Sequence, residues 1–209
     1  ALLIRTAPLA AEALEVAGRL RIVSRHGVGY DNVPVEALTR QGIPLAVIDN
    51  VIALSVAEHT LCLMLALAKS CVSLDRAVRR GRWDIRNAIA AWELSQKTLL
   101  LLGYGSIGRE VARLALAFGM KVLAFDPYVN DETMHAQGVK KLEDWRGILN
   151  QVDVLSLHLP RTPETEKAIG SAELAAMKST AFIVNTSRGG VVKEADLIDA
   201  LATGAIAGA

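Results

Sequence analysis

Short apolar runs alternate with amphipathic segments along much of this 209-residue chain, and the pattern is clearest in residues 98–126. Residues 99–102 form an uncharged apolar run of strand length. Apolar residues then recur at helical spacing through residues 107–118, and a second apolar run covers residues 122–125. The order of these segments predicts a βαβ unit of a parallel sheet.

The same alternation continues, less regularly, on both sides of this unit. Before it, we expect strands and helices in turn at residues 1–4, 8–17, 21–24, 34–41 and 43–48. After it, we expect helices at residues 131–137, 142–149, 171–177 and 195–203, and strands at residues 153–157, 181–184 and 205–209. The fold class is therefore α/β, with a doubly wound parallel sheet of the Rossmann type.

Between the two regions, residues 55–81 read as one long helix. Ser55 and Glu58 have the spacing of a capping box, and residues 61–68 are apolar almost all round, which predicts burial. The far end is basic, with five arginines in residues 76–86. A solvated or subunit-contact face explains this basic end, and binding to phosphate or nucleic acid is the alternative, although no interleaved aromatic residues favour stacking.

The glycines that follow the run at residues 99–102 indicate a binding function. Gly103, Gly105 and Gly108 form G-x-G-x-x-G between a strand and a helix. They permit a tight turn, close approach of a pyrophosphate, and close helix–strand packing, respectively. Asp126, 18 residues beyond Gly108, ends the next strand, where its carboxylate can accept hydrogen bonds from ribose hydroxyls. A purely structural glycine turn is the alternative to this dinucleotide site.

Asp126, the net charge and the cysteines limit which cofactors and partners we expect. Asp126 would repel a 2′-phosphate, and no Arg or Lys directly follows it, so the pattern favours NAD over NADP. The net charge of +1 gives no general reason to expect nucleic acid, and no apolar stretch is long enough for a membrane span. Cys62 and Cys71 are too far apart in one helix to pair, and no Cys/His cluster has metal-ligand spacing. We therefore expect a cytoplasmic protein that binds no metal.

Four patches resemble the D-isomer-specific 2-hydroxyacid dehydrogenases, and the phosphoglycerate dehydrogenase branch above all. Each patch is similar to one family motif: the substrate loop, the helix leading into the nucleotide domain, the phosphate loop and the segment of the active-site arginine. In chain order they are RHGVGYDNV (residues 25–33), SVAEHTLCLML (55–65), LGYGSIGREVA (102–112) and NTSRGGVVKEADLIDAL (185–201).

The resemblance implies hydride transfer between NAD and a small D-2-hydroxy or 2-oxo acid. It implies a partial, flavodoxin-like substrate domain over residues 1–52 and a dinucleotide-binding domain, incomplete at its end, over residues 53–209. Arg188 would be the catalytic residue that holds the substrate carboxylate and carbonyl, and it would also border the cofactor. The other implied contacts are with the substrate (Val28, Gly29), the pyrophosphate (Ser106, Ile107) and the nicotinamide half (Leu159, Thr186, Ser187, with Val28 beside the cofactor).

One departure from the family pattern affects the expected activity. The family uses a histidine general acid/base and a glutamate that orients it, both well downstream of the arginine, and no histidine follows Arg188 here. We expect the 209 residues alone to be inactive and His158, at a strand end, to be structural.

Two other functions stay open. One is a non-catalytic, corepressor-like NAD-binding member of the same family. The other is an unrelated NAD enzyme such as an adenosylhomocysteine hydrolase, which the patch at residues 185–190 disfavours. The resemblance also implies a homodimer or higher homo-oligomer through residues 55–81.

Overall fold

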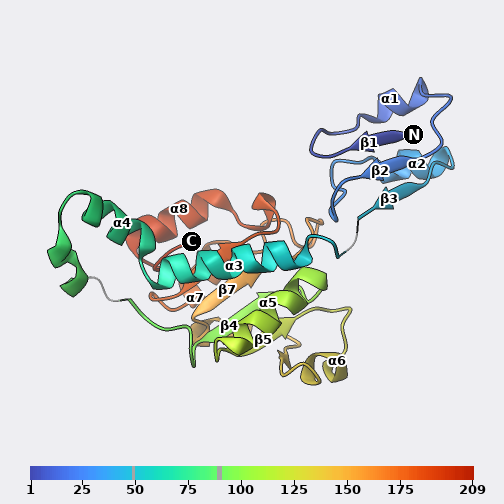
Figure 1. Cartoon of the computed structure of the whole chain (residues 1–209). Helices are drawn as coiled ribbons and strands as arrows, with labels where there is room; N and C mark the ends of the chain where they lie inside the picture. Colours follow the sequence, from blue (N-terminus) through green and yellow to red (C-terminus); the bar gives the residue numbers. More distant parts are fainter. Residues whose placement is uncertain (49, 89–90) are drawn as a thin grey trace. The chain divides into compact units, whose positions relative to one another are not determined.

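The computed structural model describes residues 1–48, 50–88 and 91–209. The chain forms two compact units, Ala1–Ile52 and Ala53–Ala209, and Figure 1 labels their elements. Among the described residues, no helix has the length and apolar character that crossing a membrane requires.

The first unit is a three-stranded parallel sheet with two short helices. Its strands have the order β1-β2-β3. Their bounds are Leu2–Ile4 (β1), Val23–Arg25 (β2) and Leu45–Val47 (β3), with helices Ala11–Glu15 (α1) and Val35–Arg40 (α2). Helix α2 lies within the predicted range 34–41, with Pro34 as its N-cap residue, and Leu14, Val23 and Leu38 are among the buried residues of a small core. Helix α1 is shorter than predicted because only Leu14 along it is buried.

The second unit is a five-stranded sheet of the predicted doubly wound type. All its strands run parallel, in the order β6-β5-β4-β7-β8. They are Thr98–Leu102 (β4), Lys121–Phe125 (β5), Lys140–Lys141 (β6), Val154–Leu157 (β7) and Phe182–Asn185 (β8). Strands β5 and β6 follow β4 toward one edge of the sheet, and β7 and β8 lie on the other side of β4. Strand order thus reverses between β4 and β7.

Helices cover both faces of this sheet. The α-helices are Ala53–Ala68 (α3), Cys71–Arg79 (α4), Ser106–Ala117 (α5), Asp131–His135 (α6), Ser171–Ala176 (α7) and Glu194–Thr203 (α8). The 3₁₀ helices are Trp83–Asn87 (η1), Arg146–Gln151 (η2) and Gly189–Val191 (η3). Helices α3 and α5 lie side by side, as Figure 1 shows.

Strand β4 contributes side chains to both hydrophobic cores of the second unit, one on each face of the sheet. Its residues Leu99 and Leu101 belong to the cluster that includes α3 and α5. Leu100 and Leu102 belong to the opposite cluster, with residues of α7 and α8. All four are 0% exposed, which explains why the sequence of this strand is continuously apolar rather than alternating.

The helix predicted over residues 55–81 is wrong in three respects. It is two helices, α3 and α4, because Ser70 has a left-handed backbone (φ 51°) that ends the first of them. Helix α3 also begins at Ala53, so Ser55 lies inside it and the predicted capping box does not form. Residues 61–68 are not buried all round either: Leu61, Met64 and Ala68 are buried, whereas Cys62 is exposed.

Two predictions near the end of the chain also change. The helix predicted over residues 142–149 is replaced by a short irregular connection that follows β6 and by helix η2. The predicted final strand is only a parallel bridge beside β8, where the Ile183 N–H donates to the Gly208 carbonyl at 3.0 Å.

Candidate functional site

The predicted site residues of the second unit lie at one edge of its sheet because the strands end in register. Leu102 of β4 pairs with Phe125 of β5 on one side and with Leu157 of β7 on the other, and Leu157 pairs with Asn185 of β8. The segments that start at residues 103, 126, 158 and 186 therefore leave the sheet at the same level. Neighbouring strands are about 4.8 Å apart, so these segments are adjacent. This is the carboxyl edge at the switch point, where doubly wound sheets bind ligands.

The glycine loop after β4 is held by close backbone contacts. Gly103 has φ +97°, and a Cβ on it would lie 2.5 Å from the His158 carbonyl oxygen. A Cβ on Gly108 would collide with the carbonyl oxygen of Gly103. Gly105 differs, because a Cβ there would meet nothing within 4 Å. Two glycines thus shape the loop, and the third leaves open space beside the backbone.

That open space lies at the start of α5. Gly105 is the residue that caps this 12-residue helix, and its backbone is extended. The first N–H groups of a helix have no acceptor within it, and the helix dipole adds positive charge there. Ser106, Ile107 and Gly108 form this first turn, so the loop fits a pyrophosphate both sterically and electrostatically.

Asp126 is tied directly to the glycine loop. One carboxylate oxygen accepts from the Tyr104 N–H at 2.8 Å, and the other accepts from the Tyr128 N–H at 2.9 Å. Each carboxylate oxygen can accept a second bond, so the group can still bind ribose hydroxyls. The carboxylate therefore has a fixed orientation before any ligand binds.

Tyr104, the middle residue of G-Y-G, holds the loop in place through its buried side chain. Its side chain is 0% exposed, and its hydroxyl donates to Gln137 Oε1 at 2.6 Å. Arg109 lies 5.7 Å from the ring centroid and donates from Nε to the Tyr104 carbonyl at 3.2 Å. Burial raises the pKa of the Tyr104 hydroxyl, and the Arg109 charge opposes that effect. The hydroxyl is therefore a neutral donor at pH 7.

The segment after β8 is organised by Asn185. Its Oδ1 accepts from the Ser187 N–H at 3.0 Å and from Ser187 Oγ at 2.8 Å. Its Nδ2 donates to the Arg188 carbonyl at 2.9 Å. The half-buried Arg188 donates from Nη1 to the Ser187 carbonyl at 2.9 Å. The backbone that carries Arg188 is thus fixed by a side chain of the strand itself.

Leu159 and Thr186, both half-buried, begin neighbouring segments of the same edge. Leu159 packs against the core formed with α7 and α8. The Thr186 hydroxyl lies 3.0 Å from that of Thr60 on α3.

The remaining predicted residues, Val28 and Gly29, lie in the first unit, half-buried in the loop after β2. There Asn32 braces the loop by accepting from Arg25 Nε at 3.3 Å and donating to the Ala7 carbonyl at 2.8 Å.

His158 has the environment of a neutral residue. Burial lowers the pKa of its imidazole from 6.5 to about 4. Its Nε2 lies 2.9 Å from the hydroxyl of Ser156, which is 0% exposed. At pH 7 the imidazole is therefore almost entirely neutral, and only a protonated imidazole is an effective proton donor.

Sequence reasoning missed three residues that hold the site together: Tyr104, Asn185 and Thr60. Tyr104 lay inside a motif whose pattern leaves its position unspecified, and Thr60 lies 126 positions away from its partner. Asn185 offered the clearest signal, because an Asn at a strand end often bonds the backbone two residues on.

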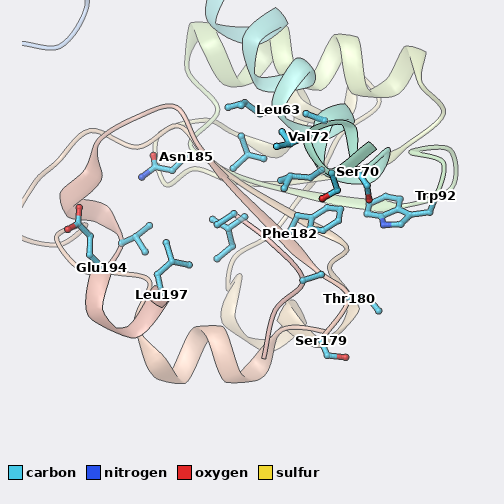
Figure 2. Close-up of a pocket in the computed structure, with 18 of the residues that line it drawn as sticks. Leu63, Ser70, Val72, Trp92, Ser179, Thr180, Phe182, Asn185, Glu194 and Leu197 are labelled. Carbon is cyan, nitrogen blue, oxygen red and sulfur yellow. The ribbon is translucent and has the colours of Figure 1, made fainter. Parts of the chain in front are cut away.

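An apolar groove of about 960 Å³ lies along β8, between α3 and α8. Figure 2 shows Trp92 toward one end and Asn185 and Glu194 toward the other. The Trp92 and Phe182 rings stack in it, with centroids 5.0 Å apart. None of residues 103–108 lines this groove, so it is distinct from the glycine loop.

We predict that two alanine substitutions in the glycine loop affect different properties, one the stability of the protein and the other its affinity for the dinucleotide. Gly108→Ala should lower the free energy of unfolding by about 2–3 kcal/mol, because its Cβ meets backbone that cannot move aside. Gly105→Ala should change it by less than about 1 kcal/mol but weaken dinucleotide binding roughly tenfold, because its Cβ enters the open space. Urea unfolding and calorimetry measure the two effects, and a Gly105 variant with unchanged affinity would contradict our placement of the pyrophosphate.

We predict that His158 makes stability depend on pH. Its pKa is lowered in the folded state, so between about pH 6.5 and pH 4 the unfolded chain binds a proton that the folded chain excludes. The free energy of unfolding should fall by about 2 kcal/mol from pH 7.5 to pH 5 through this residue. Urea titrations should show that His158→Asn removes this component, whereas substitution of the exposed His135 should leave it in place.

Comparisons with known proteins identify the family of the chain. Residues 61–209 match the sequence model of the family described as "D-isomer specific 2-hydroxyacid dehydrogenase, NAD binding domain". The chain is 40% identical over 195 residues to D-3-phosphoglycerate dehydrogenase of Methanocaldococcus jannaschii, covering 93% of this chain and 37% of that one. It is 39% identical over 207 residues to glyoxylate reductase of Korarchaeum cryptofilum, covering 98% and 62%.

Solved structures give the same result. D-lactate dehydrogenase from Aquifex aeolicus, complexed with NAD and lactic acid, superposes with a TM-score of 0.91 at 34% identity, over 100% of this chain and 63% of that one. All three relatives are enzymes, so they lend no support to a corepressor-like role. The chain spans between about one third and two thirds of their lengths. From its motifs, its sheet and these matches, the chain belongs to the D-isomer-specific 2-hydroxyacid dehydrogenase family.

Proposed function

We propose that the protein catalyses reversible hydride transfer between NAD and a small D-2-hydroxy acid, with the corresponding 2-oxo acid as the other reactant. The observation that carries this proposal is the in-register end of β5, β4, β7 and β8. It brings a ribose-binding carboxylate, a pyrophosphate-binding helix start and an arginine to one edge of the sheet. Phosphoglycerate dehydrogenase and glyoxylate reductase relatives support this substrate class.

In this proposal the two halves of the cofactor lie on either side of β4. Asp126 binds the adenosine ribose, and the first turn of α5 binds the pyrophosphate. The nicotinamide half then lies beyond β4, toward Leu159, Thr186 and Ser187. When bound, the nicotinamide supplies or accepts the hydride.

Arg188 acts on the substrate. A planar guanidinium can bind the carboxylate with two parallel hydrogen bonds, and it favours the negative charge that develops on the carbonyl oxygen as hydride arrives. By the family resemblance, backbone groups of Val28 and Gly29 in the first unit would bind a substrate carboxylate. The alkoxide also needs a proton. Its lowered pKa makes His158 a poor proton donor at pH 7. The family resemblance implies instead a histidine downstream of the arginine, which these 209 residues do not contain.

We also propose that the protein is a homodimer and works in the cytoplasm. Val72 and Val78 of α4 and Trp83 of η1 are 62%, 47% and 64% exposed, and exposed apolar and aromatic residues beside arginines are typical of subunit interfaces. Cys62 and Cys71 are both exposed and unpaired, which suits a reducing compartment.

The test of the chemistry is Arg188→Lys in the full-length protein. Lysine keeps the charge but cannot form the two parallel bonds, so kcat/KM for the 2-oxo acid should fall about 100-fold, or about 2.7 kcal/mol of transition-state stabilisation. NAD affinity should change little. Arg113→Lys, which alters an exposed arginine of α5, is the control and should keep full activity. Steady-state kinetics with glyoxylate and hydroxypyruvate measure the effect, and an unimpaired Arg188→Lys enzyme would contradict the proposed role.

The test of cofactor preference is Asp126→Ala. Loss of the carboxylate removes both the ribose acceptor and the repulsion of a 2′-phosphate, so NAD affinity should fall roughly tenfold while NADP affinity falls less. Asp131→Ala, at the exposed start of α6, should alter neither affinity. Calorimetry measures both, and a wild-type protein that binds NADP as tightly as NAD would refute the preference.

The test of assembly is sedimentation velocity at micromolar concentration. We expect a dimer, and we expect Trp83→Ala to shift it toward monomer because a large exposed ring is lost from the contact. Tyr128→Ala is a matched control, since that ring is 95% exposed and lies outside α4 and η1. A wild-type monomer would contradict the proposal.

A further inference from the structure

A pair of hydroxyl groups links α3 to the segment that carries Arg188. Thr60, in the middle of α3, is 0% exposed. Its Oγ1 lies 2.8 Å from the Val56 carbonyl oxygen and 3.0 Å from Thr186 Oγ1. Among the described residues, Thr60 and Ser156 are the Ser and Thr side chains that are buried.

The contacts of Thr60 decide which hydroxyl is the donor. A carbonyl oxygen only accepts, so the short approach of Thr60 Oγ1 to the Val56 carbonyl requires the Thr60 proton between them. A hydroxyl has one proton, so Thr60 has none left for Thr186. Thr186 must therefore donate its own proton to Thr60, and only lone pairs remain on its oxygen for any other partner.

The hydroxyl of the next residue, Ser187, also donates its proton within the protein. Ser187 Oγ donates its proton to Asn185 Oδ1 at 2.8 Å. Both hydroxyls of this segment therefore have their protons bound within the protein. Toward a ligand they are acceptors, and they fit an N–H donor better than a carbonyl.

We infer that Thr60 is a positioning residue that makes Thr186 a hydrogen-bond acceptor for the carboxamide N–H₂ of the nicotinamide. The inference rests on the proposed function, which puts the nicotinamide half beyond β4 on the side of β7 and β8. Thr60 itself touches no ligand, because it is fully buried. It acts by holding the Thr186 proton away from the cofactor.

Two dinucleotides of nearly the same shape test this inference. In 3-acetylpyridine adenine dinucleotide a methyl group replaces the carboxamide nitrogen, so the carbonyl stays and the N–H donors are lost. Calorimetry on the full-length protein gives the dissociation constants of this analogue and of NAD. The wild type should bind NAD about five- to tenfold more tightly, the worth of one hydrogen bond.

Thr60→Val keeps the shape of the side chain and removes the acceptor for the Thr186 proton. That proton is then free to reach the carbonyl that both dinucleotides share, so the preference for NAD should shrink to less than about twofold. Thr60→Ser keeps the hydroxyl and should retain the preference. Thr203→Val is a matched control on α8, since the Thr203 hydroxyl donates to the Asp199 carbonyl at 2.8 Å in the same way.

The outcomes separate the inference from the proposed function. A wild type that binds neither dinucleotide overturns both. A wild type that binds both equally, or a folded Thr60→Val protein that keeps the full preference, overturns the inference alone. If circular dichroism shows that Thr60→Val does not fold, the same affinity measurements on Thr186→Val test the inference. It removes the acceptor itself, so it should abolish the preference, and a retained preference overturns the inference.

Discussion

The contact of three backbone segments at the end of β4 is the constraint on which the second unit depends. Gly103 lies against the His158 carbonyl, and Gly108 lies against the carbonyl of Gly103. No side chain fits at either point, so the end of β4, the start of α5 and the end of β7 are held as close as peptide groups can pack. This closeness sets where α5 begins, and therefore where its unbonded N–H groups point.

From that contact the rest of the edge follows by hydrogen bonding. The Tyr104 N–H binds Asp126 and so joins the loop after β4 to the end of β5. On the other side, Asn185 and Thr186 fix the segment after β8. The groups that would meet a dinucleotide are thus rigid before it arrives, which lowers the entropy lost on binding. Preorganised polar groups of this kind are also what catalysis by charge stabilisation requires.

The sequence was informative where local chemistry determines structure. Leu99 to Leu102 predicted a buried strand, and the glycines after it predicted a turn into a helix, so the fold class and the course of the chain through this loop were predictable. It was misleading at Ser70, whose left-handed backbone breaks a helix that its composition permits. It was also silent about Thr60, because a pairing across 126 residues leaves no local pattern. Periodicity reports burial and local propensity, whereas such contacts depend on the assembled fold.

The two bonds that Asp126 accepts have a consequence for attempts to redesign the cofactor preference of this protein. The usual exchange replaces the acid by a neutral or basic residue to admit a 2′-phosphate. Here that exchange would also remove the acceptors of the Tyr104 and Tyr128 N–H groups, and with them the link between the two loops. Unbound N–H groups would loosen the glycine loop for every dinucleotide. A successful redesign therefore has to keep a carboxylate at this position, or restore its backbone acceptors elsewhere, and place the phosphate-binding cation on a neighbouring residue.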